Sequence, residues 1–303
     1  MTSAKQAIES VDAEKWGQTS IDERLRLLYL IRANILQDFD ELNQAVADRN
    51  NLPLESNKQA YTGDNASMFC MVMTANNVAA AIELYESLKK TGKPLQPNSV
   101  TKIADGLYDI YAYPLTYKDT LVYATQKMFL RVKSTEEPVV QNPMEKPAGI
   151  TAILGGGNVA QSAEIFKSLF FENRVVVHKG HPLNIESDKI WQKILKPLED
   201  HKSLAHCESS DGPALCADPR LDQIFFTGST DTAIAIERAS SAPLVAKCGG
   251  VGPHVVVPGD RPWTNFELKH QAMQICAAAK LFGGAFCARP QMIVTCKNWP
   301  QRQ

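Results

Sequence analysis

One stretch of the sequence indicates the fold most clearly, namely Gly149-Ile150-Thr151-Ala152-Ile153-Leu154-Gly155-Gly156-Gly157. It is a short apolar run that ends at three glycines, and a helical pattern follows it to about residue 171. The alternation continues, with apolar runs at 174–178, 204–207, 224–226 and 254–257 and helical patterns at 185–201 and 230–240. Such alternation is typical of a parallel sheet covered on both faces, which binds ligands at the carboxyl ends of its strands. We therefore predict an α/β fold with a Rossmann-like parallel sheet at residues 146–258.

The segments on either side of this sheet have other patterns. Residues 1–145 are predicted to be mainly helical, because apolar residues recur every three or four positions from Ile21 to Leu42, and a second helical stretch covers about 66–90. Between 100 and 140, tyrosine, threonine and valine become dense, which favours strands. Residues 259–303 contain a helical pattern at 266–281, a glycine turn with Cys287 and an apolar run at 292–295 that has no partner after it. We expect the chain to hold only the start of this last domain.

The composition argues against several classes of protein. The 303 residues include 32 basic and 33 acidic side chains, and the resulting net charge of -1 argues against nucleic-acid binding. The seven cysteines form no CxxC pair and no apolar signal segment opens the chain, so we expect reduced thiols, no zinc site and a cytoplasmic location. The six histidines lack metal-ligand spacing, and each is expected to lie at the surface or to be satisfied. No run of about 18 apolar residues predicts a membrane span.

Two glycine turns follow predicted strands. Residues 155–160 fit the pattern GxGxxA, in which backbone N–H groups approach a pyrophosphate at a helix N-terminus. The alternative is a glycine turn needed only for tight strand–helix packing. Thr227-Gly228-Ser229-Thr230 is the second turn, which either caps a helix or donates to phosphate. Where a dinucleotide site usually has an acidic residue for the ribose, the next strand ends in His178 and Lys179, which suits a 2′-phosphate.

Cys287 is the candidate nucleophile among the thiols. It lies on a Gly-Gly-Ala-Phe-Cys turn after a helix and outside any apolar stripe. An accessible cysteine near positive charge reacts as the thiolate, whereas the alternative is a buried, inert cysteine. We expect Cys276 to pack inside a helix and Cys296 to be structural.

Four segments resemble the aldehyde dehydrogenase superfamily. Phe226-Thr227-Gly228-Ser229-Thr230 matches its FTGS turn, and Lys247-Cys248-Gly249-Gly250-Val251-Gly252-Pro253 is similar to its ELGGKSP segment. Gly284-Ala285-Phe286-Cys287-Ala288 is similar to its GQxCxA nucleophile loop, and Val177-His178-Lys179-Gly180 resembles its strand ending in Lys-Pro. The resemblance covers about residues 146 to 303. It implies an N-terminal helical and β region at 1–145, an NAD(P)-binding Rossmann-like domain at 146–258 and an incomplete catalytic domain at 259–303.

By this resemblance the chain is an oxidoreductase that uses NAD or NADP to oxidise a small-molecule aldehyde to a carboxylic acid. Cys287 would attack the carbonyl and form a thiohemiacetal, from which a thioester arises that water hydrolyses. Asn158 and the Cys287 N–H would hold the oxyanion. Lys179 would bind the adenosine ribose or a 2′-phosphate, and Gly228 and Ser229 would bind the pyrophosphate. A homo-oligomer is expected for a full-length chain.

The sequence departs from the family pattern at three places. Lys247 stands where the family has its general-base glutamate, and a lysine with an ordinary pKa near ~10.4 does not activate water. Pro182 stands where an acidic residue would bind the ribose, which leaves NADP at least as suitable as NAD. The family's later glutamate at the nicotinamide ribose falls beyond residue 303, and we expect a truncated chain.

Three alternatives therefore stay open. The chain could be a catalytically impaired, dinucleotide-binding pseudoenzyme. It could be a two-domain dehydrogenase that uses residues 155–160 in the usual way without a covalent step. It could also be a gene fragment whose exposed strand edges aggregate.

Overall fold

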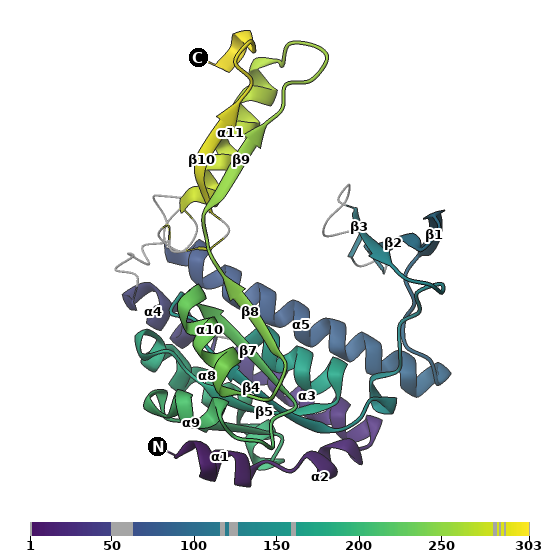
Figure 1. Ribbon diagram of the computed structural model, residues 1–303, viewed down its shortest axis with the longest axis vertical. Coiled ribbons are helices and arrows are strands. Elements are labelled where there is room, and N and C mark those ends of the chain that lie inside the picture. Colours follow the sequence, from purple (N-terminus) through teal and green to yellow (C-terminus); the bar gives the residue numbers. More distant parts are fainter. Residues whose placement is uncertain are drawn as a thin grey trace.

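A five-stranded parallel sheet organises the computed structural model, which describes residues 2–49, 63–115, 119–120, 127–158, 162–280, 284, 286–287 and 289–302 (Figure 1). The strands lie in the order β6-β5-β4-β7-β8. Their bounds are β4 Gly149–Leu154, β5 Arg174–Lys179, β6 Leu204–Cys207, β7 Gln223–Gly228 and β8 Leu244–Cys248. From β4 the chain adds β5 and β6 on one side, and it then adds β7 and β8 on the other side, so the strand order reverses between β4 and β7. The carboxyl ends of these two strands therefore flank the usual ligand crevice of an open α/β sheet.

Helices cover both faces of this sheet, as predicted. The first layer comprises α2 Ala13–Gly17, α3 Ile21–Gln37, α4 Phe39–Arg49, α5 Gly63–Thr91, α7 Ser162–Phe166 with the π-helical turn Lys167–Phe171, and α8 Ile185–Asp200. The second layer comprises α1 Ala4–Ser10, α9 Gly212–Cys216 and α10 Thr230–Ala239. Successive strand residues alternate between the layers: Ile153 packs with the first, and Leu154 packs with the second.

A buried arginine joins the N-terminal helices to the sheet. Arg24 on α3 is fully buried and donates to the Tyr85 hydroxyl at 2.8 Å, to the Trp16 carbonyl at 2.7 Å and to the Asn173 side-chain oxygen at 2.6 Å. Its guanidinium also lies 4.3 Å from the centre of a Trp16 ring. Burial lowers the pKa of Arg24. Because Asn173 directly precedes β5, this network fixes α2, α3 and α5 against the start of that strand.

The edge of the sheet differs from the prediction. The apolar run at 254–257 was expected as the fifth parallel strand, and this expectation is wrong, because β9 Gly252–Val256 pairs with β10 Pro290–Thr295 instead. The fifth strand is β8, which pairs with β7. As an edge strand, β8 is mostly exposed and includes Lys247, so it lacks the continuous apolar run of a central strand.

The N-terminal region is helical, with one break that the apolar pattern hides. The repeat from Ile21 to Leu42 predicts one helix, but the chain leaves helical geometry at Asp38, between α3 and α4. Strands occur between 100 and 140 as predicted. They are β1 Ser99–Ala104, β2 Leu107–Tyr113 and β3 Met128–Lys133, and they form a separate antiparallel sheet in the order β1-β2-β3.

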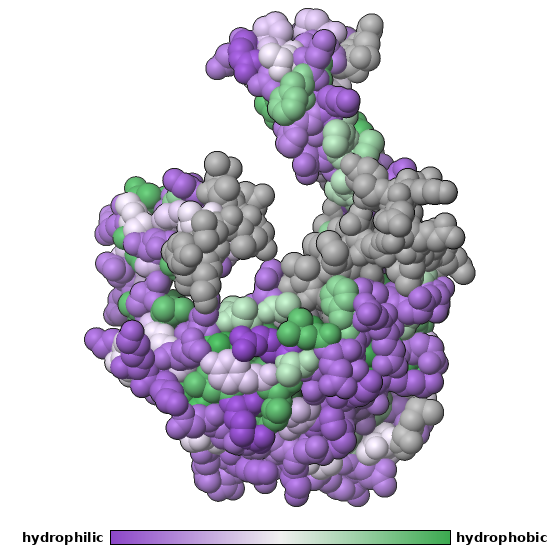
Figure 2. All heavy atoms as spheres, turned by 180° about the vertical axis from the view of Figure 1, so that it is seen from behind, coloured by the Kyte–Doolittle hydropathy of each residue, from purple (hydrophilic) through white to green (hydrophobic). Residues whose placement is uncertain are grey.

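The C-terminal segment projects from the body of the molecule (Figure 1). It consists of β9, α11 Asn265–Lys280 and β10, and α11 has no buried residue. Phe266 is 79% exposed and Met292 is 58% exposed, and Figure 2 shows hydrophobic residues among the hydrophilic ones on this projection. Among the helices that the structure describes, none is long and apolar enough to cross a membrane. The domain limits at 145 and 258 stay a prediction.

Candidate functional site

The glycine loop after β4 is held in place by two side chains from other elements. The Asn184 amide donates to the Gly156 carbonyl at 2.9 Å. Arg49, the last residue of α4, donates to the Asn158 carbonyl at 3.1 Å and also to the Gly157 carbonyl. These contacts tie the loop to the end of α4 and to the residue before α8, and they place Asn158 at the carboxyl end of β4.

The crowding around this loop explains its glycines. A Cβ atom on Gly156 would lie 2.9 Å from the Thr227 Cγ2 atom, and one on Gly157 would lie 3.0 Å from the His181 ring. Tight packing thus requires glycine at both positions, whether or not a ligand binds there. Residues 159–161, which include the end of the predicted fingerprint, lie outside the described residues.

The turn after β7 leaves its backbone uncovered. A Cβ atom on Gly228 would overlap the ring of Phe226, whose Cε2 atom would be only 3.0 Å away. Ser229 is the N-cap of α10, and its hydroxyl accepts a hydrogen bond from the Thr232 N–H at 3.2 Å. The free N–H groups and the dipole of a helix N-terminus favour an anion at this turn.

Cys287 lies on a tight turn beside the end of β8. The Arg289 N–H closes this turn by donating to the Phe286 carbonyl at 3.2 Å. The side chain of Cys287 is exposed, so the expectation of a buried cysteine at this position is wrong. A Cβ atom on Gly250 would lie 3.8 Å from the Cys287 Cα atom, which places the segment after β8 next to this turn.

These segments together line one cleft of about 530 Å³ at the carboxyl edge of the sheet. It contains four of the five predicted site residues, namely Asn158, Gly228, Ser229 and Cys287. The complete lining is Gly156, Gly157, Asn158, Thr227, Gly228, Ser229, Lys247, Cys248, Gly249, Gly250, Gly284, Phe286, Cys287, Arg289 and Gln291. The cleft therefore combines an exposed thiol, an amide side chain, a helix N-terminus and two cations.

Lys247 forms an ion pair at the wall of this cleft. Its ammonium contacts the carboxylate of Glu164 on α7, which is 7% exposed, whereas the Lys247 side chain is 61% exposed. Position 247 thus presents a cation that is paired with an acidic residue. The carboxylate of this pair belongs to Glu164 on α7 and not to position 247. An ammonium held in this way is no general base for water.

Lys179, the fifth predicted residue, lies outside the lining of the cleft. It ends β5 at the same edge of the sheet, and its register partners are Leu154 on β4 and Cys207 on β6. Its aliphatic chain passes close to Gly212 at the start of α9. Burial lowers the pKa of Lys179. The structure therefore separates Lys179 from Cys287 by two strands, along the edge on which ligands of such sheets lie.

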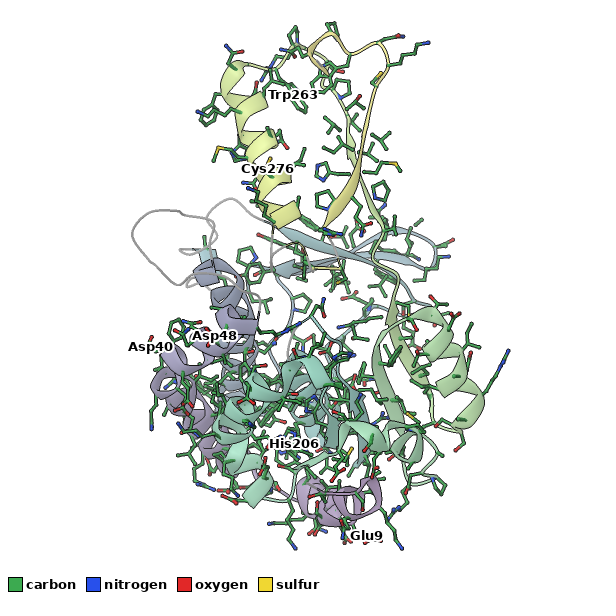
Figure 3. The ribbon with its side chains drawn as sticks, turned by 90° about the vertical axis from the view of Figure 1, so that its left-hand side faces the viewer. Glu9, Asp40, Asp48, His206, Trp263 and Cys276 are labelled. Carbon is green, nitrogen blue, oxygen red and sulfur yellow. The ribbon has the colours of Figure 1, made fainter. Side chains whose placement is uncertain are left out.

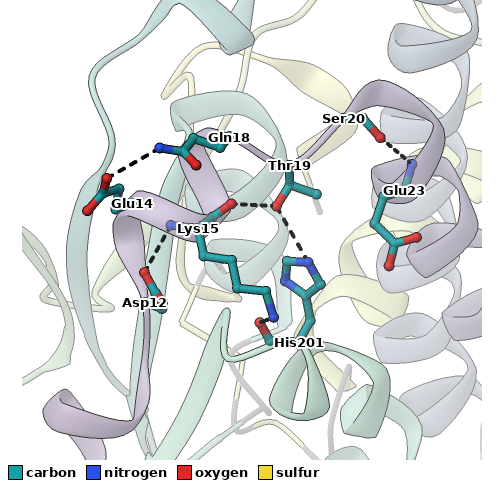
Figure 4. A pocket seen from close by; sticks show the side chains of 8 residues that line it. All are labelled: Asp12, Glu14, Lys15, Gln18, Thr19, Ser20, Glu23 and His201. Atoms are coloured by element: carbon teal, nitrogen blue, oxygen red, sulfur yellow. Dashed lines mark hydrogen bonds between the residues drawn. The ribbon is translucent and has the colours of Figure 1, made fainter.

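A second hollow, of about 450 Å³, has the wrong location for a ligand site (Figure 4). Its lining includes Asp12, Lys15, Ser20 and His201. Asp12 and Ser20 accept hydrogen bonds from backbone N–H groups as helix caps, so their polar atoms already have partners. His201 follows α8 and precedes β6, which places the hollow at the amino end of the strands.

Two expectations about cysteine and histidine are corrected. Cys276 and Cys296 are exposed on the projecting C-terminal segment, so Cys276 does not pack inside a core (Figure 3). His178 is buried, with its Nδ1 atom 3.2 Å from Nδ1 of His206 and its Nε2 atom without a hydrogen-bond partner. Burial holds the pKa of His178 well below its ordinary value. Within the described residues, no group of three or more His, Cys, Asp or Glu side chains could hold a metal ion.

One residue that lines the cleft, Cys248, and two that contact its lining, Arg49 and Glu164, were not predicted as site residues. Arg49 comes from a helix more than a hundred positions before Asn158, and no local pattern marks it. Glu164 reads as an ordinary helix residue in the sequence. Cys248 has a local signal in the sequence, because it is a second cysteine that stands next to Lys247 at the end of a strand.

Comparison with known proteins gives a result at the level of structure. No protein-family model and no curated protein matches this sequence. An aldehyde dehydrogenase from Bartonella henselae matches 98% of this chain with a TM-score of 0.63 and 14% identity. A glyceraldehyde-3-phosphate dehydrogenase from Methanocaldococcus jannaschii, complexed with NADP, also matches 98% with a TM-score of 0.63, at 15% identity.

These matches cover only part of the solved structures. The chain spans 54% of the Bartonella protein and 56% of the Methanocaldococcus protein. An aldehyde dehydrogenase from Physcomitrella patens, in complex with succinate, gives the same picture, with 15% identity, a TM-score of 0.63 and coverage of 97% of this chain and 53% of that one. The chain thus has the fold of the aldehyde dehydrogenases over about half the length of these solved structures.

Proposed function

We propose that this chain carries the thiol and cofactor half of an aldehyde-oxidising site that uses NAD or NADP. The observation that supports it is the shared cleft, in which Cys287 and Asn158 lie with Gly228 and Ser229 at the point where the strand order reverses. An open parallel sheet binds dinucleotides at this point. The exposed thiol beside it is the residue that an aldehyde carbonyl requires for covalent catalysis.

The residues at the sheet edge suit a dinucleotide. Gly228 is exposed and carries no side chain, so a pyrophosphate could approach its backbone closely, and the N-terminus of α10 supplies N–H donors. Lys179 and its ammonium lie two strands away, where the far ribose or a 2′-phosphate would reach. When bound, the nicotinamide supplies the acceptor for the two electrons and the hydrogen that leave the aldehyde carbon.

The chain's own residues would handle the carbonyl. The Cys287 sulfur attacks the carbonyl carbon, and the carbonyl oxygen becomes an oxyanion that the Asn158 amide and the Cys287 N–H stabilise as donors. After oxidation of the carbon, the product stays on Cys287 as a thioester. Release as a carboxylic acid needs one water, which adds its oxygen to the acyl carbon and returns a proton to the thiol.

The ion pair at Lys247 supports a second candidate function. Because Lys247 is bound to Glu164 and provides no base, the water step lacks its activating group at this position. A chain of this kind binds the dinucleotide and forms the acyl-cysteine, but releases it slowly or not at all. The alternative of a dinucleotide-binding pseudoenzyme is the extreme case, in which the chain binds the dinucleotide and forms no acyl-cysteine.

Calorimetric titration with NAD and NADP, followed by mass spectrometry after addition of an aldehyde, tests both candidates. The proposed function expects dinucleotide binding and a mass increase of one acyl group that disappears in Cys287→Ser but persists in the matched control Cys296→Ser. Binding without any acyl adduct supports the pseudoenzyme. Absence of dinucleotide binding, or an adduct that persists in Cys287→Ser, contradicts the proposal.

A further inference from the structure

Two exposed thiols line the same cleft. Cys248 is the last residue of β8, and Cys287 lies on the neighbouring turn. Both side chains are exposed, in contrast to Cys216, which is 2% exposed. Among the residues that the structure describes, the Cys248 thiol donates one weak hydrogen bond, to the Ser229 carbonyl at 3.6 Å. Cys248 itself belongs to the lining of the cleft.

Two glycines connect Cys248 to the point where its segment lies next to Cys287. Gly249 and Gly250 follow Cys248, with φ angles of 93° and 125° that favour glycine. A Cβ atom on Gly250 would lie 3.8 Å from the Cys287 Cα atom. Since two residues span at most about 7 Å, the Cα atoms of the two cysteines lie within about 13 Å of each other. A disulfide requires about 4.4–6.8 Å, so a movement of about 6 Å at most closes the gap.

We propose that Cys248 is a resolving cysteine for Cys287, and that a peroxide converts the pair into a reversible intramolecular disulfide. The Cys287 thiolate attacks one peroxide oxygen, becomes a sulfenic acid and releases water once a proton is taken up. The Cys248 sulfur then attacks the sulfenic sulfur, and the hydroxyl leaves as a second water. In total, two thiols and one hydrogen peroxide give one disulfide and two waters.

The surroundings favour this pair over other thiol pairs. Burial raises the pKa of both Cys207 and Cys216 to about 11, which makes them poor nucleophiles at neutral pH. Cys276 lies on α11 in the projecting segment, whereas Cys248 belongs to the sheet (Figure 3). This proposal goes beyond the proposed function, because it needs the two thiols of the cleft and no dinucleotide or aldehyde.

The disulfide would close the cleft at its chemical centre. Cys248 is the register partner of Gly228 across β7 and β8. A bond from Cys248 to Cys287 therefore draws the nucleophile turn toward the turn that precedes α10. While the bond exists, Cys287 can neither attack a carbonyl nor be oxidised further, and a dithiol reductant restores it.

The test treats the full chain with hydrogen peroxide, alkylates the remaining thiols, digests the protein and sequences the linked peptides by mass spectrometry. The wild type and the control Cys296→Ser are expected to give a Cys248–Cys287 linkage that dithiothreitol reverses. Cys248→Ser is expected to give sulfinic acid at Cys287, which dithiothreitol does not reverse. Linkage of Cys287 to Cys276 or Cys296, or sulfinic acid at Cys287 in the wild type while Cys248 is still alkylated, overturns the proposal. None of these readouts depends on dinucleotide binding.

Discussion

Replacement of Gly228 by alanine tests the geometry of the cleft most directly. The new methyl carbon would stand 3.0 and 3.1 Å from two ring carbons of Phe226 and closer still to a third. Carbon atoms in good contact are about 3.5–4.0 Å apart, so the methyl carbon would stand about 0.4 Å or more too close to three ring atoms. Phe226 is 8% exposed and belongs to the core under α9 and α10. Its ring can therefore yield only by displacing its neighbours or by turning into the cleft.

Overpacking of this kind costs about 1–3 kcal/mol of unfolding free energy, and Gly228→Ala is expected to lose that amount in urea titrations. The methyl group also covers backbone that the proposed pyrophosphate would approach, so the dinucleotide dissociation constant should rise at least tenfold, or about 1.4 kcal/mol. Gly249→Ala is the matched control. A Cβ atom there meets nothing within 4 Å, and only its φ of 93° opposes a side chain.

The control therefore separates backbone strain from steric overlap. Gly249→Ala should lose about 1 kcal/mol of stability through strain and keep most of the dinucleotide affinity. If Gly228→Ala unfolds at the same urea concentration as the wild type, the position of the Phe226 ring beside Gly228 is not as described. If it loses stability but binds the dinucleotide with unchanged affinity, the turn after β7 is not the pyrophosphate site.

Three further predictions concern stability and reactivity. Burial raises the pKa of Asp188 to about 6, above the ordinary value, because the folded chain favours the neutral carboxyl. The stability that the neutral carboxyl contributes is present below about pH 4 and is lost as the pH rises through 6. Asp188→Asn should therefore be more stable than the wild type at pH 7 in urea titrations and should lose that pH dependence. Arg24→Met removes three charge-assisted hydrogen bonds but also a buried charge, and calorimetric unfolding should show a net loss of about 2–4 kcal/mol; equal stability would contradict the role of the network. Iodoacetamide should label Cys287 at least tenfold faster than Cys207 or Cys216, as peptide mass spectrometry can measure, and equal rates would contradict their burial.

The central part of the sheet could be predicted from the sequence because its strands are buried on both faces. Such strands are continuous apolar runs: β4 at Gly149–Leu154 has the predicted limits, and β5 at Arg174–Lys179 ends one residue beyond its predicted limit. The edge at β8 could not be predicted in the same way. β8 is exposed and contains Lys247, whereas the more apolar run near Val255 pairs with β10 outside the sheet, where Val255 is 59% exposed. The apolar content of a segment thus predicted its burial correctly for the central strands of the sheet, but not for β8 and β9.

The candidate site shows the same limit. Turn chemistry after β7 marks Gly228 and Ser229, because a glycine and a capping serine are local signals, whereas Asn158 was named through the family resemblance. Contacts between distant elements have no such signal. The hydrogen bonds of Arg49 to the glycine loop and the pairing of Glu164 with Lys247 arise only once α4, α7 and β8 meet at one edge of the sheet.

The two residues at the end of β8, Lys247 and Cys248, provide a cation and a thiol to the cleft instead of a base. By the family resemblance, this strand end would carry a carboxylate that activates water, but here it carries Lys247 and Cys248. The carboxylate that is present, Glu164, faces the ammonium of Lys247, so the pair has no net charge to offer a water molecule. Under the proposed function Cys287 becomes acylated, and the described lining of the cleft presents no carboxylate that would activate water to release it by hydrolysis. The neighbouring thiol of Cys248 gives that sulfur a different reversible state, because an oxidised Cys287 can return to the thiol through a disulfide and a reductant.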